Sequence, residues 1–298
     1  MAKKLEPPTD SEKFQKLIVL DSEREVNGLL KSWGIPLDSS SFHAENTDAG
    51  KDNSPDITDE DTLLKFPRTS HILNLGAATR DDKVLGTSDL ARILGSVSPN
   101  EDRSPNLVIE EKMDGANMGI FISKNTFKIM AQNRSHYISS KYHPQFSPLD
   151  RWMDNHSSDL WQILEPGRHI LYGEWLYATH SVEYTSLPGW FIAYDLFDKE
   201  TQTFVSRKVL AEKLAQTSIP HVPVVHHGPI NNIEQIKAMV DGPSAFNEAR
   251  REGIVVRVQD SKDERLVMRA KLVRSDFIAG NERWNKSKTL QTNKLMIQ

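Results

Sequence analysis

A lysine and an aspartate stand two residues apart in the stretch 110–117, directly after an apolar run. The amine of Lys112 is a nucleophile once it loses its proton, and Asp114 supplies a carboxylate beside it. In a cleft that removes water from the amine, burial lowers the pKa of Lys112 and makes a fraction of it neutral. The stretch therefore predicts covalent chemistry at Lys112, although a pattern this short also occurs in ordinary solvated hairpin loops.

Two apolar, β-branched segments flank this stretch, at 107–109 and 118–122, and predict two strands joined by a tight polar loop at a sheet edge that faces a cleft. Similar patterns predict further strands at 126–131, 170–176, 190–198, 252–258 and 266–272. Helical spacing predicts helices at 89–94, 152–164, 208–216 and 232–240. Strands outnumber helices in the middle of the chain, which indicates an α+β fold with largely antiparallel sheets flanked by helices.

The composition excludes several classes of site. The 298 residues include no cysteine, which rules out disulfides, thiolate metal sites and a cysteine nucleophile. The first residues contain no apolar signal segment, and no later run is long enough to cross a bilayer. We therefore expect a soluble intracellular protein without membrane association, in either the cytoplasm or the nucleus.

Charge is distributed unevenly between the two ends of the chain. Residues 1–65 hold 14 acids and 8 bases, whereas residues 262–298 hold 9 bases and 4 acids. We expect an N-terminal helical segment at 13–33 followed by an acidic, disordered linker at 37–61, so that residues 1–62 precede a folded domain at 63–298. The basic tail of that domain either binds phosphates or forms plain solvated surface.

Six short motifs follow one another in a fixed order along the domain. They are Lys112-x-Asp114-Gly115, Asn133-Arg134-Ser135, Tyr172-Gly173-Glu174, Phe191-x-x-Tyr194-Asp195, Glu252-Gly253-x-Val255-Val256 and Arg269-Ala270-Lys271. This ordered set resembles the covalent nucleotidyltransferases, which comprise ATP-dependent DNA ligases, RNA ligases and mRNA capping enzymes. The resemblance covers about residues 107–275 and implies an ATP-grasp-like adenylation domain.

The resemblance also implies roles for individual residues. Lys112 matches the nucleophile that takes up a nucleotide, and Asp114 matches the acid of the same motif. Glu252 and Lys271 complete the expected catalytic set, with Lys271 at the α-phosphate. The residues expected to contact the nucleotide are Glu111, Asn117, Arg134, Glu174, Phe191 and Arg269. Glu174 and Glu252 correspond to the two cleft glutamates, which either bind ribose or hold Mg²⁺ or Mn²⁺ directly or through water, because hard cations prefer carboxylate oxygens.

Two of these assignments have an alternative or a departure from the family pattern. Phe191 and Tyr194 lie on opposite faces of one strand, so only one of them can stack on the base. Its place in the motif favours Phe191, and the other residue is expected in the core. Arg269 stands where the pattern usually has a lysine, which keeps the charge but changes its geometry.

Sequence features outside the six motifs indicate which branch of the superfamily the chain resembles. About 27 residues follow Lys271, too few for the oligonucleotide-binding (OB) barrel of DNA ligases and capping enzymes, so we expect no such barrel. Asn117 and the extended segment 65–73 resemble features of RNA-repair ligases. The expected function is ATP-dependent joining of RNA 5′-phosphate and 3′-hydroxyl ends through lysyl-AMP, without an obligate protein partner. A minimal DNA ligase, a GTP-using capping-type enzyme and a binding protein without catalytic activity are the alternatives.

Overall fold

The computed structural model describes residues 62–76, 83–94, 106–260, 262, 264–277 and 290–296. The helix expected at 13–33 and the linker expected at 37–61 lie outside these residues. Within them, no helix is both long and apolar enough to span a membrane.

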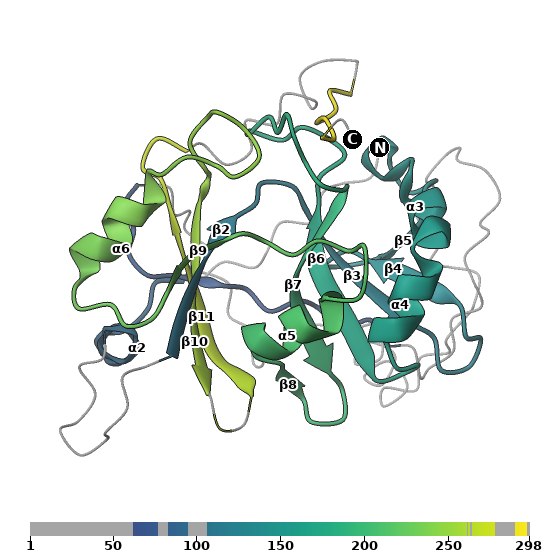
Figure 1. Ribbon diagram of the computed structural model, residues 1–298, viewed down its shortest axis with the longest axis horizontal. Coiled ribbons are helices and arrows are strands. Elements are labelled where there is room, and N and C mark those ends of the chain that lie inside the picture. Colours follow the sequence, from purple (N-terminus) through teal and green to yellow (C-terminus); the bar gives the residue numbers. More distant parts are fainter. Residues whose placement is uncertain are drawn as a thin grey trace, which may run out of the picture. The chain divides into compact units, whose positions relative to one another are not determined.

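Two mainly antiparallel sheets form the framework (Figure 1). The five-stranded sheet has the order β1 (Ser70–His71), β11 (Arg265–Val273), β10 (Gly253–Asp260), β2 (Asn106–Lys112) and β9 (Val224–His227). The six-stranded sheet has the order β5 (Tyr137–Ile138), β4 (Ile129–Gln132), β3 (Ala116–Ile122), β6 (His169–Trp175), β7 (Phe191–Asp198) and β8 (Thr203–Phe204). Only the β1–β11 pair among these strands is parallel. The α+β class with antiparallel sheets is confirmed.

Helices cover one face of each sheet. In the five-stranded sheet, apolar side chains of β2, β10 and β11 pack against α2 (Thr87–Ile93) and α6 (Ile233–Val240). In the six-stranded sheet, the core packs against α3 (Leu149–Asn155), α4 (Ser157–Ile163) and α5 (Arg207–Leu214), as Figure 1 shows. A short 3₁₀ helix, η1 (Pro144–Phe146), precedes α3.

The helix expected at 152–164 is two helices. His156 ends α3 and begins α4, and its ring stacks on Trp152 with centroids 4.1 Å apart. The sequence Asn155-His156-Ser157-Ser158 explains the break, since these residues have low helix propensity and favour helix ends.

The chain passes from one sheet to the other at residues 113–115. β2 and β3 belong to different sheets, so the loop after Lys112 is a crossing between sheets and does not close a hairpin. Gly115 allows this crossing, because a Cβ there would lie 2.6 Å from the carbonyl oxygen of Trp175. The crossing brings Lys112 to the space between the two sheets.

Candidate active site

A cavity of about 550 Å³ is lined by residues from both sheets. Seven of the ten residues expected to act in catalysis or to bind the nucleotide or metal line it: Glu111, Lys112, Asn117, Arg134, Glu174, Arg269 and Lys271. Asp114, Glu252 and Phe191 are not among the lining residues. The structure thus brings most of the expected site residues to this cavity, and the other three lie near it or in the core, as described below.

Lys112 forms an ion pair at the end of β2. Its Nζ lies 2.7 Å from Oε2 of Glu252, because Lys112 is the register partner of Gly253 on β10. Burial alone would lower the pKa of Lys112, but the carboxylates of Glu252, Glu174 and Asp114 outweigh burial and raise it. The expectation of a lowered pKa is therefore wrong for this state, since the cleft that buries the amine also surrounds it with acids.

Glu252 is buried and Glu174 is half-buried beside the amine, and both hold their protons more tightly than usual. Burial raises the pKa of Glu174 to about 8, and the carboxylates of Glu252 and Asp114 add to this while Lys112 opposes it. Burial likewise raises the pKa of Glu252 to about 7, against the attraction of Lys112. A cation placed between these carboxylates would stabilise their charged forms.

Asp114 is fixed by the loop that follows β6. Its Oδ2 accepts hydrogen bonds from the backbone nitrogens of Ser181 and Val182, both at 2.7 Å, and its own nitrogen donates to the hydroxyl of Tyr184 at 2.9 Å. The aspartate therefore shapes the loop and contributes negative charge near Lys112.

Glu111 is bound by the loop that precedes β10. Its carboxylate accepts hydrogen bonds from the hydroxyl of Ser244 at 2.5 Å and the nitrogen of Ala245 at 2.9 Å, and its side chain is buried. These contacts attach β2 to the loop before β10.

Of the two aromatic residues considered from the sequence, Tyr194 lines the cavity and Phe191 does not. Phe191 is fully buried in the core, where it packs on Trp152 and against Gly173. The choice of Phe191 from its motif position is corrected by this placement, while the expectation that the two rings face opposite ways holds. The Tyr194 hydroxyl accepts a hydrogen bond from Nδ2 of Asn117, whose Oδ1 is buried without a hydrogen-bond partner.

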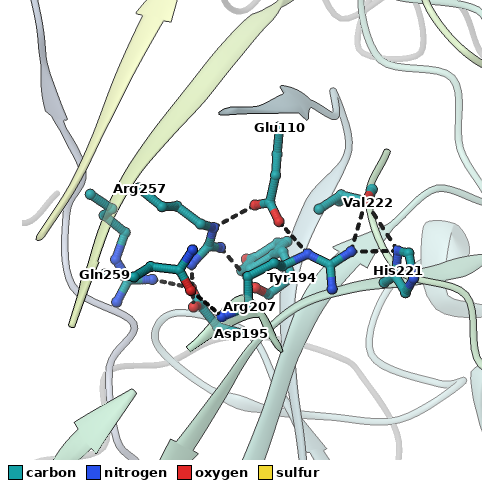
Figure 2. A network of polar contacts seen from close by, with 9 residues as sticks. Glu110, Tyr194, Asp195, Arg207, His221, Val222, Arg257 and Gln259 are labelled. Atoms are coloured by element: carbon teal, nitrogen blue, oxygen red, sulfur yellow. Dashed lines mark hydrogen bonds and ion pairs between the residues drawn. The ribbon is translucent and has the colours of Figure 1, made fainter. Parts of the chain in front are cut away.

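Arg269 forms an ion pair with Asp195, which belongs to a buried network of charges at the cavity; Figure 2 shows Asp195, Glu110, Arg257 and Arg207 of this network. Asp195 accepts hydrogen bonds from Arg269 and, at 2.7 Å, from Arg257, and Glu110 accepts from Arg257 and, at 2.6 Å, from Arg207. Arg257 also donates to the carbonyl oxygen of Tyr194 at 2.7 Å, as Figure 2 shows. The network joins β2, β10 and β11 of one sheet to β7 of the other.

The guanidinium of Arg269 also lies between two aromatic rings, 4.5 Å from the centroid of Phe66 and 4.0 Å from that of Phe204. Burial lowers its pKa, with Asp195 acting in the opposite direction. Lys271, two residues further along β11, also lines the cavity.

Sequence reasoning gave no role to Glu110, Arg207 or Arg257. A signal was present, because Glu110 ends an apolar run and Arg257 interrupts another, and a charge in a buried strand requires a partner. The identity of that partner depends on tertiary contacts.

Among the described residues, no group of three or more histidine, aspartate or glutamate side chains is arranged to hold a metal ion. Glu174 and Glu252 are the carboxylates beside Lys112. Such a pair suits Mg²⁺ or Mn²⁺ that takes its remaining ligands from phosphates and water. The donor set therefore fits a cation bound together with a nucleotide.

A family model described as RNA ligase matches residues 105–273. The chain belongs to the RNA ligase family. No curated protein matches it by sequence. A variant of Naegleria gruberi RNA ligase with ATP and Mn has a similar structure, at 19% identity, 76% coverage of this chain, 58% coverage of that chain and a TM-score of 0.51.

The structure of Naegleria gruberi RNA ligase with PPi is also similar, at 20% identity, 79% coverage of this chain, 64% coverage of that chain and a TM-score of 0.50. This RNA ligase family member therefore shares the fold of those proteins and spans about three fifths of their length.

Proposed function

We propose that the chain is an ATP-dependent RNA ligase that joins 5′-phosphate and 3′-hydroxyl ends through AMP bound covalently to Lys112. The observation that carries the proposal is the Lys112–Glu252 contact of 2.7 Å at a cavity that Arg134, Glu174 and Lys271 also line. Family membership supports the class of reaction, and the relative solved with ATP and Mn supports the choice of nucleotide.

Three displacements make up the proposed reaction. The neutral amine of Lys112 attacks the α-phosphorus of ATP, so that a nitrogen–phosphorus bond forms and pyrophosphate leaves. A 5′-phosphate oxygen of RNA then attacks the same phosphorus, and the lysine leaves and regains a proton. Finally the 3′-hydroxyl attacks the activated 5′-phosphate, loses its proton, and AMP leaves.

Proton removal from Lys112 is the step for which the site needs help, because the surrounding acids raise the pKa of the amine. Glu252 is within hydrogen-bond reach of Nζ and has a pKa of about 7, which suits a general base at neutral pH. Lys271 and Arg134 supply positive charge for the phosphates.

A divalent cation would be held by Glu174 and Glu252 in this proposal. When bound, it supplies positive charge that stabilises the phosphate oxygens as pyrophosphate leaves. It would also offset the carboxylates that keep Lys112 protonated, and so favour the neutral amine.

Tyr194 is the proposed stacking partner of the base. It is half-buried on the cavity wall, and the unpartnered Oδ1 of Asn117 beside it is an acceptor that a donor group of the nucleotide would satisfy. A buried carbonyl without a partner is costly, so this atom indicates a ligand at that point.

The test is transfer of radiolabel from α-labelled ATP to the protein with Mg²⁺ or Mn²⁺, followed by a denaturing gel. Wild-type protein should become labelled and Lys112→Ala should not, because the acceptor amine is gone. Label from GTP in place of ATP would reject the choice of nucleotide, and label retained by Lys112→Ala would show that the nucleophile is elsewhere.

A panel of 5′-phosphorylated RNA, DNA and hybrid nicks tests the substrate. Sealing of RNA ends supports the proposal, and sealing of DNA alone supports the minimal DNA ligase. A protein that binds ATP and RNA but neither takes up label nor releases pyrophosphate would be a binding protein.

A further inference from the structure

The rim of the cavity continues onto the surface through the segment from Asn133 to Phe146, here called the rim segment. Four of its residues at one end, 133–136, and two at the other, 145–146, line the cavity. The residues between them, 137–144, include the exposed ring of Tyr142. The rim segment is therefore a surface that begins inside the candidate active site and leads outward from it.

The rim segment is basic although the chain is acidic overall. The chain has a formal net charge of −4, yet no aspartate or glutamate occurs between Asp114 and Asp150. The same interval holds Lys124, Lys128, Arg134 and Lys141. Asp150, the acid that ends the interval, accepts hydrogen bonds from the nitrogen of Ser140 at 2.8 Å and its hydroxyl at 2.5 Å, so its charge serves to fix the rim segment.

Tyr142 is an exposed aromatic ring that is held in place. Its side chain is 46% exposed, and its hydroxyl lies 3.1 Å from Nδ1 of His136. The ring contacts Phe146 on the cavity wall, with centroids 6.1 Å apart and planes inclined at 57°. An exposed ring that is held at its hydroxyl and lies beside a second ring can stack on a base with little loss of conformational entropy.

We propose that the rim segment binds a single-stranded stretch of RNA next to the end that occupies the cavity. Arg134 and Lys141 contact its phosphates, and Tyr142 stacks on one of its bases. Fixed aromatic rings between cations are the usual means of binding single strands without sequence preference. This inference rests on the proposed function and adds to it the place where the RNA leaves the cavity.

The C-terminal basic segment is a weaker candidate for this role. Arg269 is buried against Asp195, and Arg274 is paired with Asp276 at 3.0 Å. Arg283, Lys286 and Lys288 lie outside the described residues. Two of the cations expected to hold phosphates are therefore already engaged within the protein.

The test is fluorescence anisotropy with a short labelled RNA that lacks its 3′-hydroxyl, measured with the full chain in EDTA and without ATP. Tyr142→Ala should weaken binding about 5-fold to 100-fold, which corresponds to the usual contribution of one stacked base. Tyr142→Phe should retain most of the affinity because it keeps the ring. Lys141→Gln should reduce the slope of log affinity against log salt by about 0.7.

Trp161→Ala is the matched control. Trp161 is 44% exposed, close to the 46% of Tyr142, but lies on α4 and stacks on Phe127 outside the rim segment. Its replacement should leave RNA affinity unchanged. Equal affinity of Tyr142→Ala and wild type, or an equal loss in Trp161→Ala, would overturn the inference.

Label uptake from ATP, measured on the same wild-type protein, separates the two proposals. Because the anisotropy assay contains no ATP or metal, its result depends on RNA binding alone. Absence of label with normal RNA binding rejects the proposed ligase reaction and leaves the rim segment to be judged by its own variants.

Discussion

Replacement of Arg257 by methionine tests whether the buried charges join the two sheets. Arg257 is 3% exposed and donates to Glu110, to Asp195 at 2.7 Å and to the carbonyl oxygen of Tyr194 at 2.7 Å. Removal of one member of a buried ion pair costs about 3–5 kcal/mol, since the remaining charge loses its partner without regaining water. Arg207 and Arg269 still hold the two carboxylates, so we expect the lower end, about 3 kcal/mol.

The measurement is urea unfolding. With a slope of about 2–3 kcal/mol per M, a loss of about 3 kcal/mol lowers the midpoint by about 1–1.5 M. Arg257→Lys should fall between wild type and Arg257→Met, because it keeps the charge but cannot reach three acceptors at once. Arg151→Met, an exposed position on α3, should leave the midpoint unchanged.

The same variant reports on the cavity. Arg257 holds the backbone of Tyr194, so at temperatures where Arg257→Met is still folded we expect KM for ATP in label uptake to rise more than kcat falls. A midpoint equal to that of wild type would refute the reasoning, because it would mean that the carboxylates do not depend on this cation.

Three further predictions concern other parts of the site. Label uptake should rise with pH from the acid side, because protonated Glu252 and Glu174 can neither accept a proton nor bind a cation. Burial raises their pKa values to about 7 and 8 in the metal-free site, and a bound cation shifts the rise to lower pH. Glu252→Gln should change this profile, and an unchanged profile would exclude Glu252 as a source of the rise. Asn293→Ala should lower the free energy of unfolding by about 3 kcal/mol, measured by urea unfolding, because the buried amide makes four hydrogen bonds to the loop that binds Asp114. Lys294→Ala, at the exposed neighbouring position, is the control and should leave it unchanged. Gly115→Ala should lower label uptake at least tenfold, since the added Cβ would lie 2.6 Å from the carbonyl oxygen of Trp175. Normal uptake by this variant would show that the crossing between the sheets tolerates a side chain.

The sequence predicts most strands and helices because each has a clear local pattern. The segment 252–258 begins one residue before β10, and 266–272 lies within β11. The segments 208–216 and 232–240 nearly coincide with α5 and α6. Local patterns do not show that the strands divide into two sheets. Two apolar strands joined by a short loop look the same whether they pair with each other or belong to different sheets. The two cases differ in tertiary contacts, such as the close approach of Gly115 to Trp175 at the end of β6.

The sequence predicted which residues line the site, but not which groups surround each of them. Motif order brought Lys112, Glu174 and Lys271 to one cavity, because the motifs lie on strands whose ends meet there. The pKa of Lys112 and the choice between Phe191 and Tyr194 depend on which groups face each side chain across the cavity. Those neighbours come from strands distant in the sequence, so no pattern within one strand reveals them.

In the five-stranded sheet, successive side chains of a strand face the apolar core and the cavity in turn, so the same strands carry core residues and site residues. Ile109, Ile254, Val256, Ala270 and Leu272 face the apolar core, whereas Glu110, Lys112, Arg257, Arg269 and Lys271 line the cavity. Because side chains alternate with a period of two, a slip of one residue in β2 would put Glu111 in place of Lys112. Glu110 and Arg257 are diagonal neighbours in the β2–β10 pairing, so their ion pair forms only in the observed register. The buried charges therefore favour the register that places Lys112 at the cavity, so the network would support the proposed reaction without contact with the substrate.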